Sequence, residues 1–432
     1  MDKKDDAGHR RAQRERPYMK ELEFFRVKTP EQVLALIKEF SPAGIEEVPL
    51  VQGLGRVLAC ELPAPEDLPS FPRSAMDGFA VRARDTFGAS EALPGLFEVV
   101  GEVGMGEVPE ISIGQGQTVR IYTGGVLPQG ADAVVMLEYA QMLDEKTVEL
   151  SRPVSPLEHV IQVGEDISRG SSLLPIGHRL RPQDLGLLGA EGITRIPVYK
   201  KPRVAVMSTG DEIVPPTEVP PPGKIRDINS ITLTAQVEAW GGIPLPMGII
   251  QDQCDVLRTQ IEEALASADL VLISGGSSVG SRDYTLKVIQ SFPDSEILVH
   301  GIAISPGKPT ILARVVAKPI WGLPGHAASA MIVSLLFVKP LIRYLAGEKP
   351  DTPDKKIKPP LCARLTRNCP SAQGREEYIR VTLTKREGEW WAEPIFGKSG
   401  LISTLVKAQG VIRIPKDDEG MEEGTLVEVI LF

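Results

Sequence analysis

The spacing of hydrophobic residues changes several times along the chain, and each change predicts a different kind of structure. Apolar residues at helical spacing after Thr29 and Pro30 predict a helix over about 30–40, because threonine caps helices and proline is favoured at their first position. Over 62–160, short β-like runs alternate with glycine and proline turns, which predicts a small all-β module. The mixed segment 161–198 includes a predicted helix over 182–188.

Strand and helix patterns alternate between 203 and 346, which predicts a doubly wound parallel sheet. The predicted strands are 203–208, 246–250, 270–273, 297–300, 310–313 and 319–323. The predicted helices are 229–240, capped by Asn229 or Ser230, and 253–266, 284–290 and 327–345. A lysine- and proline-rich stretch over 347–358 predicts a linker, and the rest of the chain predicts a small β barrel. The fold class is therefore α/β multidomain.

Composition narrows the classes of function. The 432 residues predict about two to four domains, and the net charge of -9 argues against a general nucleic-acid binder, although a pocket can still be locally basic. The four cysteines form no C-x-x-C pair, which favours reduced thiols over zinc or disulfides. The charged N-terminus lacks the apolar core of a signal peptide, and the longest apolar run, 331–338, is too short to span a membrane. We therefore expect a cytoplasmic protein with no membrane partner.

Four predicted loops at one edge of the sheet carry unusual polar residues. Ligands bind outside the carboxyl ends of strands in open α/β sheets, and the loops 208–212, 251–252, 274–283 and 306–309 leave strands there. Each loop alone fits ordinary turn chemistry, whereas the four together favour a binding site. None matches the phosphate-loop motif of nucleoside triphosphatases or the dinucleotide fingerprint, which disfavours both classes.

The loop 274–283 carries the most specific chemistry. A glycine- and serine-rich turn between a strand and a helix presents backbone N–H groups to an anion, phosphate above all. Asp283 beside such a turn suggests a metal ion or a proton transfer. In the neighbouring loop, Lys308 stands between two prolines. It is either a fixed phosphate or oxyanion contact or a solvated turn lysine.

Two polar clusters occur in the β module, at 73–78 and 122–125. Asp77 precedes a glycine, so a local turn is the simpler interpretation of this residue in isolation. The five histidines show no metal-ligand spacing, and a tight zinc site is not expected.

Eight motifs together resemble one family. They are Arg73-Ser-Ala-Met-Asp-Gly-Phe-Ala, Thr123-Gly-Gly, Gly130-Ala-Asp-Ala-Val-Val, Gly164-Glu-Asp-Ile, Ser208-Thr-Gly-Asp-Glu, Ile225-Arg-Asp-Ile-Asn-Ser, Ser274-Gly-Gly to Asp283-Tyr, and Pro306-Gly-Lys-Pro. In order and spacing they are similar to the molybdenum insertases, or molybdopterin molybdenumtransferases, which include the E domain of gephyrin. The match covers roughly residues 25 to 430.

The resemblance implies a subunit of several parts and a homodimer. The implied parts are an elongated dimer-forming module 20–61 plus 161–198, the β module 62–160, a molybdopterin-binding α/β domain 199–346, and a C-terminal β barrel 347–432. The charged tail 1–19 that precedes them is expected to be disordered, because it lacks apolar residues for a core. The implied reaction inserts molybdate into adenylylated molybdopterin and releases AMP with the help of Mg²⁺. Molybdopterin adenylyltransferase and molybdoenzyme-maturation proteins are the implied partners, with neither nucleic acid nor membrane.

The resemblance also assigns roles to residues. The implied catalytic residues are Asp77, Glu212, Asp252 and Asp283, of which Glu212, Asp252 and Asp283 are the implied magnesium ligands. The implied contacts to substrate, phosphate or molybdate are Thr123, Thr209, Gly210, Asp211, Gly275, Gly276, Ser278, Lys308, Ser329, Arg380 and Ser399. Asp77 and Thr123 are expected to act on the pocket of the partner subunit.

The sequence departs from the family pattern in two places. The family usually has Gly-Asn-Pro-Val-Ser where this chain has Gly325-His326-Ala327-Ala328-Ser329, and it often has a lysine where this chain has Ser305. One cation is lost, and His326 replaces it only when protonated. An insertase that prefers tungstate, or a molybdopterin-binding paralogue with little turnover, therefore stays open.

Overall fold

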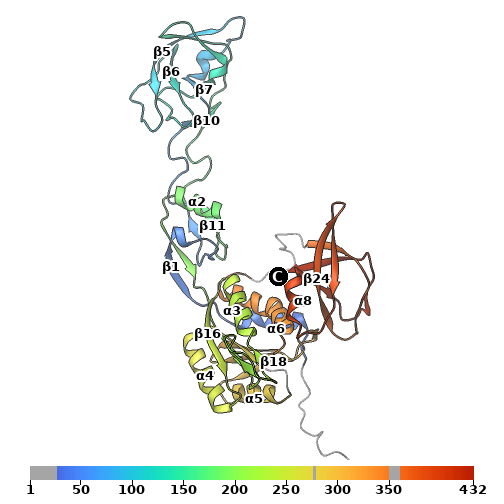
Figure 1. Ribbon diagram of the computed structural model, residues 1–432. Helices are drawn as coiled ribbons and strands as arrows, with labels where there is room; N and C mark the ends of the chain where they lie inside the picture. The colour runs from blue at the N-terminus through green and yellow to red at the C-terminus, as the bar shows by residue number, and fades with distance from the viewer. Residues whose placement is uncertain (1–26, 276–278, 350–360) are drawn as a thin grey trace, which may run out of the picture. The chain divides into compact units, whose positions relative to one another are not determined.

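The computed structural model describes residues 27–275, 279–349 and 361–432, without the side chains of 279–283 (Figure 1). The chain divides into two compact units. Unit 1 combines the residues up to Gly44 with those from Lys200 onwards, and unit 2 contains Ile45–Tyr199.

Unit 1 is built on a six-stranded sheet. Its strands, in spatial order, are β16 (Ile243–Ile250), β13 (Arg203–Thr209), β17 (Leu270–Gly275), β21 (Lys318–Leu323), β20 (Ile311–Val315) and β18 (Glu296–His300). The first four are parallel to one another, whereas β20 is antiparallel to both of its neighbours. The doubly wound sheet is thus confirmed, with one strand reversed.

The reversal of β20 has a local cause. Only Val316 and Ala317 connect β20 to β21, and both have positive φ angles, of 49° and 63°. Two such residues form the tight turn of a hairpin, and a hairpin joins antiparallel strands only.

Helices cover both faces of this sheet (Figure 1). α4 (Cys254–Ser267) and α5 (Val279–Gln290) pack on one face. The other face is covered by α3 (Asn229–Ala239), α1 (Pro30–Ala35), the 3₁₀-helix η1 (Leu36–Glu39), and the continuous helical run of α6 (Ala327–Val333), the π-helix η5 (Ser334–Val338) and α7 (Lys339–Leu345). This run of 19 residues is apolar enough to cross a membrane, but most of it is buried in the core of unit 1.

The first helix begins as the sequence predicts. The Thr29 hydroxyl accepts from the N–H of Gln32, whose side chain accepts in return from the N–H of Thr29, which is a capping box. However, the helix packs on the α/β sheet, whereas the expected division placed it in the elongated module. The reason is that Val33, Ile37 and Phe40 are buried in the core of the sheet.

The C-terminal part of unit 1 is a closed β barrel, as predicted. Its main strands are β22 (Leu361–Leu365), β24 (Glu376–Arg386), β25 (Glu389–Ile395), β26 (Gly410–Ile414) and β28 (Leu426–Leu431), and a β24–β26 pairing closes it. The short strands β23 (Cys369–Pro370) and β27 (Gly420–Met421) pair with each other, and α8 (Ile402–Lys407) lies between β25 and β26 in the chain. β19 (Ile304–Ser305), which comes from the α/β part, pairs with the start of β24. The two parts of unit 1 are thereby joined through their backbones.

Unit 2 contains the predicted all-β module. Its sheet has the strand order β7 (Ala133–Met136), β4 (Gly78–Val81), β6 (Gln117–Ile121), β5 (Gly95–Val103), β9 (Thr147–Leu150) and β8 (Ala140–Met142).

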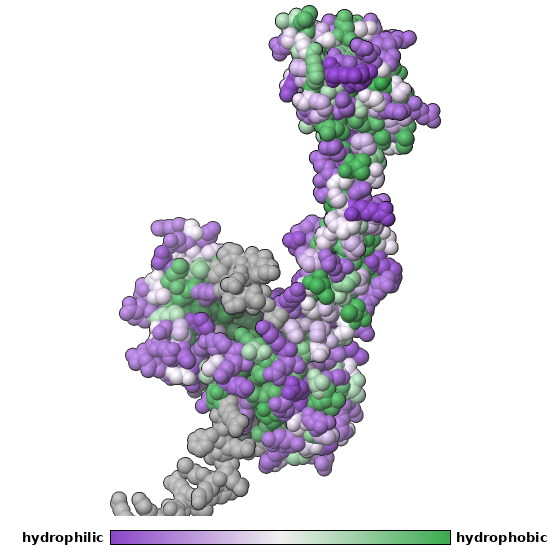
Figure 2. Space-filling model, turned by 180° about the vertical axis from the view of Figure 1, so that it is seen from behind, coloured by the Kyte–Doolittle hydropathy of each residue, from purple (hydrophilic) through white to green (hydrophobic). Residues whose placement is uncertain are grey.

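The rest of unit 2 combines two distant stretches of sequence, as expected for the elongated module. It pairs β1 (Ile45–Pro49) with β12 (Arg195–Tyr199), β2 (Leu62–Pro63) with β11 (Ser172–Leu174), and β3 (Arg73–Ser74) with β10 (Val160–Ile161), and it contains α2 (Pro182–Ala190). Within the described residues this module begins near 45 and not at 20. On the face shown in Figure 2, hydrophilic residues are interspersed with small apolar clusters over both units.

Candidate active site

The carboxyl edge of the unit 1 sheet brings several predicted site residues together. Thr209 ends β13, and Asp252 follows the end of the neighbouring strand β16. The Thr209 hydroxyl donates a hydrogen bond to the Asp252 carboxylate. Gly275 pairs with Thr209 from the other side, in β17. The prediction that these loops meet at one edge is confirmed for these three residues.

The turn after β13 places a second carboxylate beside its own backbone. A Cβ atom added to Gly210 would lie 2.8 Å from a carboxylate oxygen of Glu212, and the φ angle of Gly210 is +152°. The flexible Glu212 side chain could move away from such a Cβ atom, but residues with a side chain rarely adopt this φ angle, so the turn favours glycine. Asp211, between them, is exposed to solvent.

Three predicted residues are not fully described. Gly276 and Ser278 lie outside the described residues, and for Asp283 the structure gives only its place in α5. Among the side chains that the structure does describe, no three His, Cys, Asp or Glu residues gather closely enough to hold a metal ion. The expected magnesium set of Glu212, Asp252 and Asp283 therefore stays a prediction.

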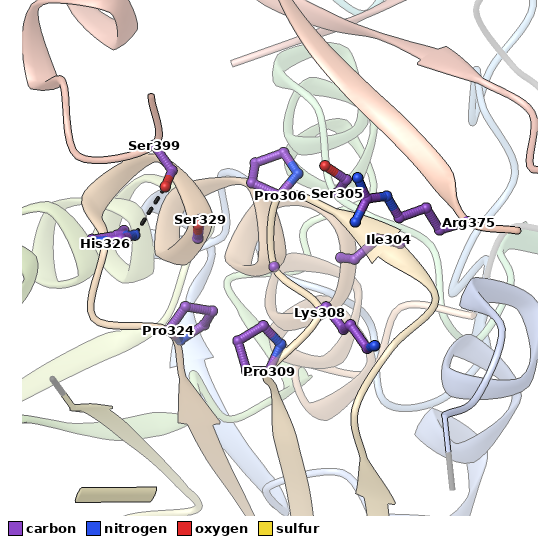
Figure 3. A pocket seen from close by; sticks show the side chains of 11 residues that line it. Ile304, Ser305, Pro306, Lys308, Pro309, Pro324, His326, Ser329, Arg375 and Ser399 are labelled. Carbon is purple, nitrogen blue, oxygen red and sulfur yellow. Dashed lines mark hydrogen bonds between the residues drawn. The ribbon is translucent and has the colours of Figure 1, made fainter. Parts of the chain in front are cut away.

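A second group of predicted residues lines a cavity of about 230 Å³, which we call the Lys308 cavity (Figure 3). Its lining residues are Ile304, Ser305, Pro306, Gly307, Lys308, Pro309, Pro324, His326, Ser329, Arg375 and Ser399. The α/β part contributes all of these except the last two, which come from the barrel part. The predicted contacts Lys308, Ser329 and Ser399 thus meet in one place, together with Ser305 and His326, the two departures from the family pattern.

The loop that carries Lys308 has a fixed course. The φ angle of Gly307 is +117°, and a Cβ atom there would lie 2.5 Å from a methyl group of Val333. The Thr310 hydroxyl donates to the Gly307 carbonyl at 2.7 Å, and the N–H of Ile302 donates to the Lys308 carbonyl at 2.9 Å. These contacts hold the backbone of Lys308 at the cavity wall.

His326 and Ser399 join the two walls of the cavity. The Ser399 hydroxyl lies 2.9 Å from Nδ1 of His326, and the Ser399 carbonyl accepts from the N–H of Ala328 at 3.1 Å (Figure 3). The barrel loop is therefore attached directly to the start of α6.

Arg380 does not line the cavity, in contrast to the expected oxyanion contact. It is only 7% exposed, and its guanidinium donates to the Gly397 carbonyl at 2.8 Å and to the Thr404 hydroxyl. Burial lowers the pKa of this guanidinium. Arg380 thus holds the loop on which Ser399 lies.

The arginine that does reach the cavity is Arg375, whose side chain extends towards Ser305 (Figure 3). Sequence reasoning missed it. Arg375 lies in the bend directly before β24, whereas Arg380 lies within that strand. No local pattern in the sequence marks Arg375 as the residue that reaches the cavity.

In unit 2, Asp77 and Thr123 are in direct contact. One carboxylate oxygen of Asp77 accepts from both the N–H and the hydroxyl of Thr123, each at 2.7 Å. These hydrogen bonds hold the pKa of Asp77 below its usual value, the backbone bond having the larger effect. The carboxylate thus joins two distant motifs of the sequence, where a local turn was the simpler interpretation.

The architecture and these two groups of residues define a multidomain α/β protein with polar side chains at a sheet edge and around a cavity beside the barrel. Comparison with known families identifies the family to which the chain is similar. Residues 28–192 match the MoeA N-terminal region (domain I and II), residues 205–344 the probable molybdopterin binding domain, and residues 362–432 the MoeA C-terminal region (domain IV).

Individual relatives agree over nearly the whole chain. The molybdopterin molybdenumtransferase of Bacillus subtilis is 35% identical over 394 residues, which cover 90% of each chain. That of Staphylococcus epidermidis is 34% identical over 411 residues, covering 94% of this chain and 96% of the relative. The crystal structure of the molybdopterin biosynthesis moea protein from Pyrococcus horikoshii matches with a TM-score of 0.80 and 38% identity, covering 94% of this chain and 99% of that one.

The chain therefore belongs to the molybdopterin molybdenumtransferase (MoeA) family, whose members are transferases of molybdenum cofactor biosynthesis. The family expected from the eight sequence motifs is confirmed.

Proposed function

We propose that this enzyme inserts molybdate into adenylylated molybdopterin and releases AMP in a Mg²⁺-dependent step, giving molybdenum cofactor. The Lys308 cavity is the observation that supports this most directly. Its wall combines the cations of Lys308 and Arg375 with the hydroxyls of Ser329 and Ser399. Cationic and hydroxyl donors are the groups that bind a tetrahedral oxyanion.

The carboxylates at the sheet edge support the second half of the proposal. Mg²⁺ is commonly held by one or two carboxylates together with water and substrate phosphate oxygens. Asp252, which the Thr209 hydroxyl orients, fits such a donor set. We propose Asp252, Asp283 and Glu212 as the residues that hold the ion, which would neutralise phosphate charge when bound. We also propose that the glycine- and serine-rich sequence that begins at Gly275 binds a phosphate group through its backbone N–H groups.

The proposal is tested by incubating the purified protein with adenylylated molybdopterin, molybdate and Mg²⁺. We expect AMP, measured by chromatography, and active cofactor, measured by reconstitution of a cofactor-free molybdoenzyme. Asp252→Asn should abolish AMP release. The matched control is Asp269→Asn, because Asp269 accepts a hydrogen bond from the N–H of Arg203 at the amino end of the same sheet. Substrate binding without AMP release by the unaltered protein would contradict the proposal.

A tungstate-preferring insertase is the second candidate. It is favoured by Ser305 and His326, which replace family residues in the wall of the Lys308 cavity. A molybdopterin-binding paralogue with little turnover has the same support. The same assay with tungstate in place of molybdate separates the three: faster AMP release with tungstate supports the second candidate, and no release with either oxyanion supports the paralogue.

We also propose that the protein acts as a cytoplasmic homodimer that receives its substrate from molybdopterin adenylyltransferase. In this arrangement Asp77 and Thr123 of one subunit serve the pocket of the other. The direct contact of these two residues supports a shared role.

A further inference from the structure

Asn229 is a buried polar residue at the start of α3 to which the proposed chemistry gives no role. It is 6% exposed, and its side-chain amide donates two hydrogen bonds, to the Ser274 hydroxyl at 2.7 Å and to the Gly325 carbonyl at 2.8 Å. The Gly325 carbonyl can only accept, so the orientation of the amide is fixed. The sequence prediction gave Asn229 or Ser230 the role of helix cap. However, Asp227 caps the helix, because its carboxylate accepts from the N–H of Ser230 at 3.1 Å.

The position of Asn229 matters because the pairing of β17 with β21 stops there. β17 and β21 are paired up to Ser274 and Leu323. Beyond this point β17 ends at Gly275, and the residues after β21 form the turn at Gly325. The two N–H groups of Asn229 connect these two segments after the backbone pairing has ended.

Asn229 is itself held in place from a third strand. Its neighbour Asp227 accepts a hydrogen bond from the Ser208 hydroxyl of β13 at 2.9 Å, and both residues are buried. The start of α3 is thereby fixed to the strand that ends at Thr209. The side-chain oxygen of Asn229 has no hydrogen-bond partner among the described residues, so Asn229 joins these elements through its two donated hydrogen bonds alone.

We propose that Asn229 is a positioning residue that fixes the Lys308 cavity relative to the end of β17 at Ser274 and Gly275. Gly325 directly precedes His326, which contacts Ser399 across the cavity. The second N–H of the Asn229 amide donates to Ser274, which directly precedes Gly275. Displacing the Gly325 turn therefore moves a wall of the cavity relative to Ser274. The identity of the ligands, molybdate in the cavity and phosphate at the sequence that begins at Gly275, rests on the proposed function.

Asn229→Asp tests this with little change of shape. A carboxylate oxygen in place of the amide nitrogen can accept from the Ser274 hydroxyl, whereas Asn229 donates to it. However, the carboxylate cannot donate to the Gly325 carbonyl and repels it. We expect molybdate to bind about tenfold more weakly by calorimetry, as for loss of one buried hydrogen bond. We also expect faster hydrogen exchange of the amides over 324–328. The matched control is Thr232→Val, because the Thr232 hydroxyl donates only to backbone carbonyls at the start of α3.

The outcomes separate positioning from mere stability. A lower melting temperature with unchanged molybdate affinity and unchanged exchange over 324–328 would refute the positioning role. If Asn229→Asp does not fold, Asn229→Ser removes both donors without adding charge and carries the same expectations. If the unaltered protein binds neither molybdate nor tungstate, the proposed function fails, and the exchange measurement still decides the role of Asn229.

Discussion

Replacement of Arg380 by methionine is expected to release the barrel loop that carries Ser399. The Arg380 guanidinium donates to the Gly397 carbonyl and the Thr404 hydroxyl, which lie on either side of Ser399 in the chain. Two hydrogen bonds from a charged donor contribute about 3–6 kcal/mol together. The buried guanidinium also costs desolvation free energy that methionine does not, so we expect a net loss of about 2 kcal/mol in the free energy of unfolding.

Two measurements follow from this estimate. Urea unfolding, followed by tryptophan fluorescence, should show a lower midpoint for Arg380→Met, because Trp390 and Trp391 lie on strand β25 of the barrel. Molybdate binding should weaken about tenfold, because the Ser399 hydroxyl and carbonyl are no longer held at His326 and Ala328.

A double-mutant cycle distinguishes positioning from direct contact. If Arg380 acts through Ser399, the variant with both Arg380→Met and Ser399→Ala should bind molybdate about as weakly as Arg380→Met alone. Multiplicative losses in the double variant would show that Arg380 contacts the oxyanion itself, and unchanged stability of Arg380→Met would refute the structural reasoning.

The remaining predictions concern charge and assembly. Arg375→Gln should weaken molybdate binding about 10- to 100-fold in calorimetry, since it removes a charged donor from the cavity wall, and unchanged affinity would contradict this. Asp77→Ala and Asp252→Ala should each be inactive alone. When the two variants are mixed as dimers, about a quarter of the unaltered activity should return, because half of the dimers then hold one intact pocket. No recovery would contradict a role of Asp77 across the dimer. Hydrogen bonds from Arg181 hold the pKa of Asp184 far below its usual value, so the stability that this carboxylate contributes is complete above about pH 4 and is lost as the pH falls. Urea unfolding should therefore show Asp184→Asn to be destabilised by about 2 kcal/mol at pH 7, with a smaller difference at pH 3; an equal difference at both pH values would contradict this.

Much of the α/β fold is predictable because its signals are local. Buried strands are short apolar runs. The first helix is marked by its capping residue Thr29, by Pro30 and by Gln32, which lie within four consecutive positions. The reversed direction of β20 is not predictable in this way. Its turn is formed by Val316 and Ala317, and neither is the glycine or asparagine that usually marks a tight hairpin turn.

The candidate site also has one part that the sequence predicts and one part that it does not. The meeting of Thr209, Asp252 and Gly275 follows from topology, because neighbouring parallel strands end at one edge. The Lys308 cavity does not follow from topology, because its second wall depends on the pairing of β19 with β24, which are far apart in sequence. No local pattern shows this pairing, so Arg375 was missed.

The departure at Ser305 has a physical explanation in this wall. A tetrahedral oxyanion such as molybdate carries two negative charges, and Lys308 and Arg375 already bring two positive charges to the cavity. A lysine in place of Ser305 would add a third cation beside Arg375, and like charges in close contact disfavour one another's charged forms (Figure 3). In the proposed function, Arg375 of the barrel thus supplies a cation to the wall where the family often has a lysine at the position of Ser305. The charge of the site thus depends on the junction between the α/β part and the barrel as well as on the loops at the sheet edge.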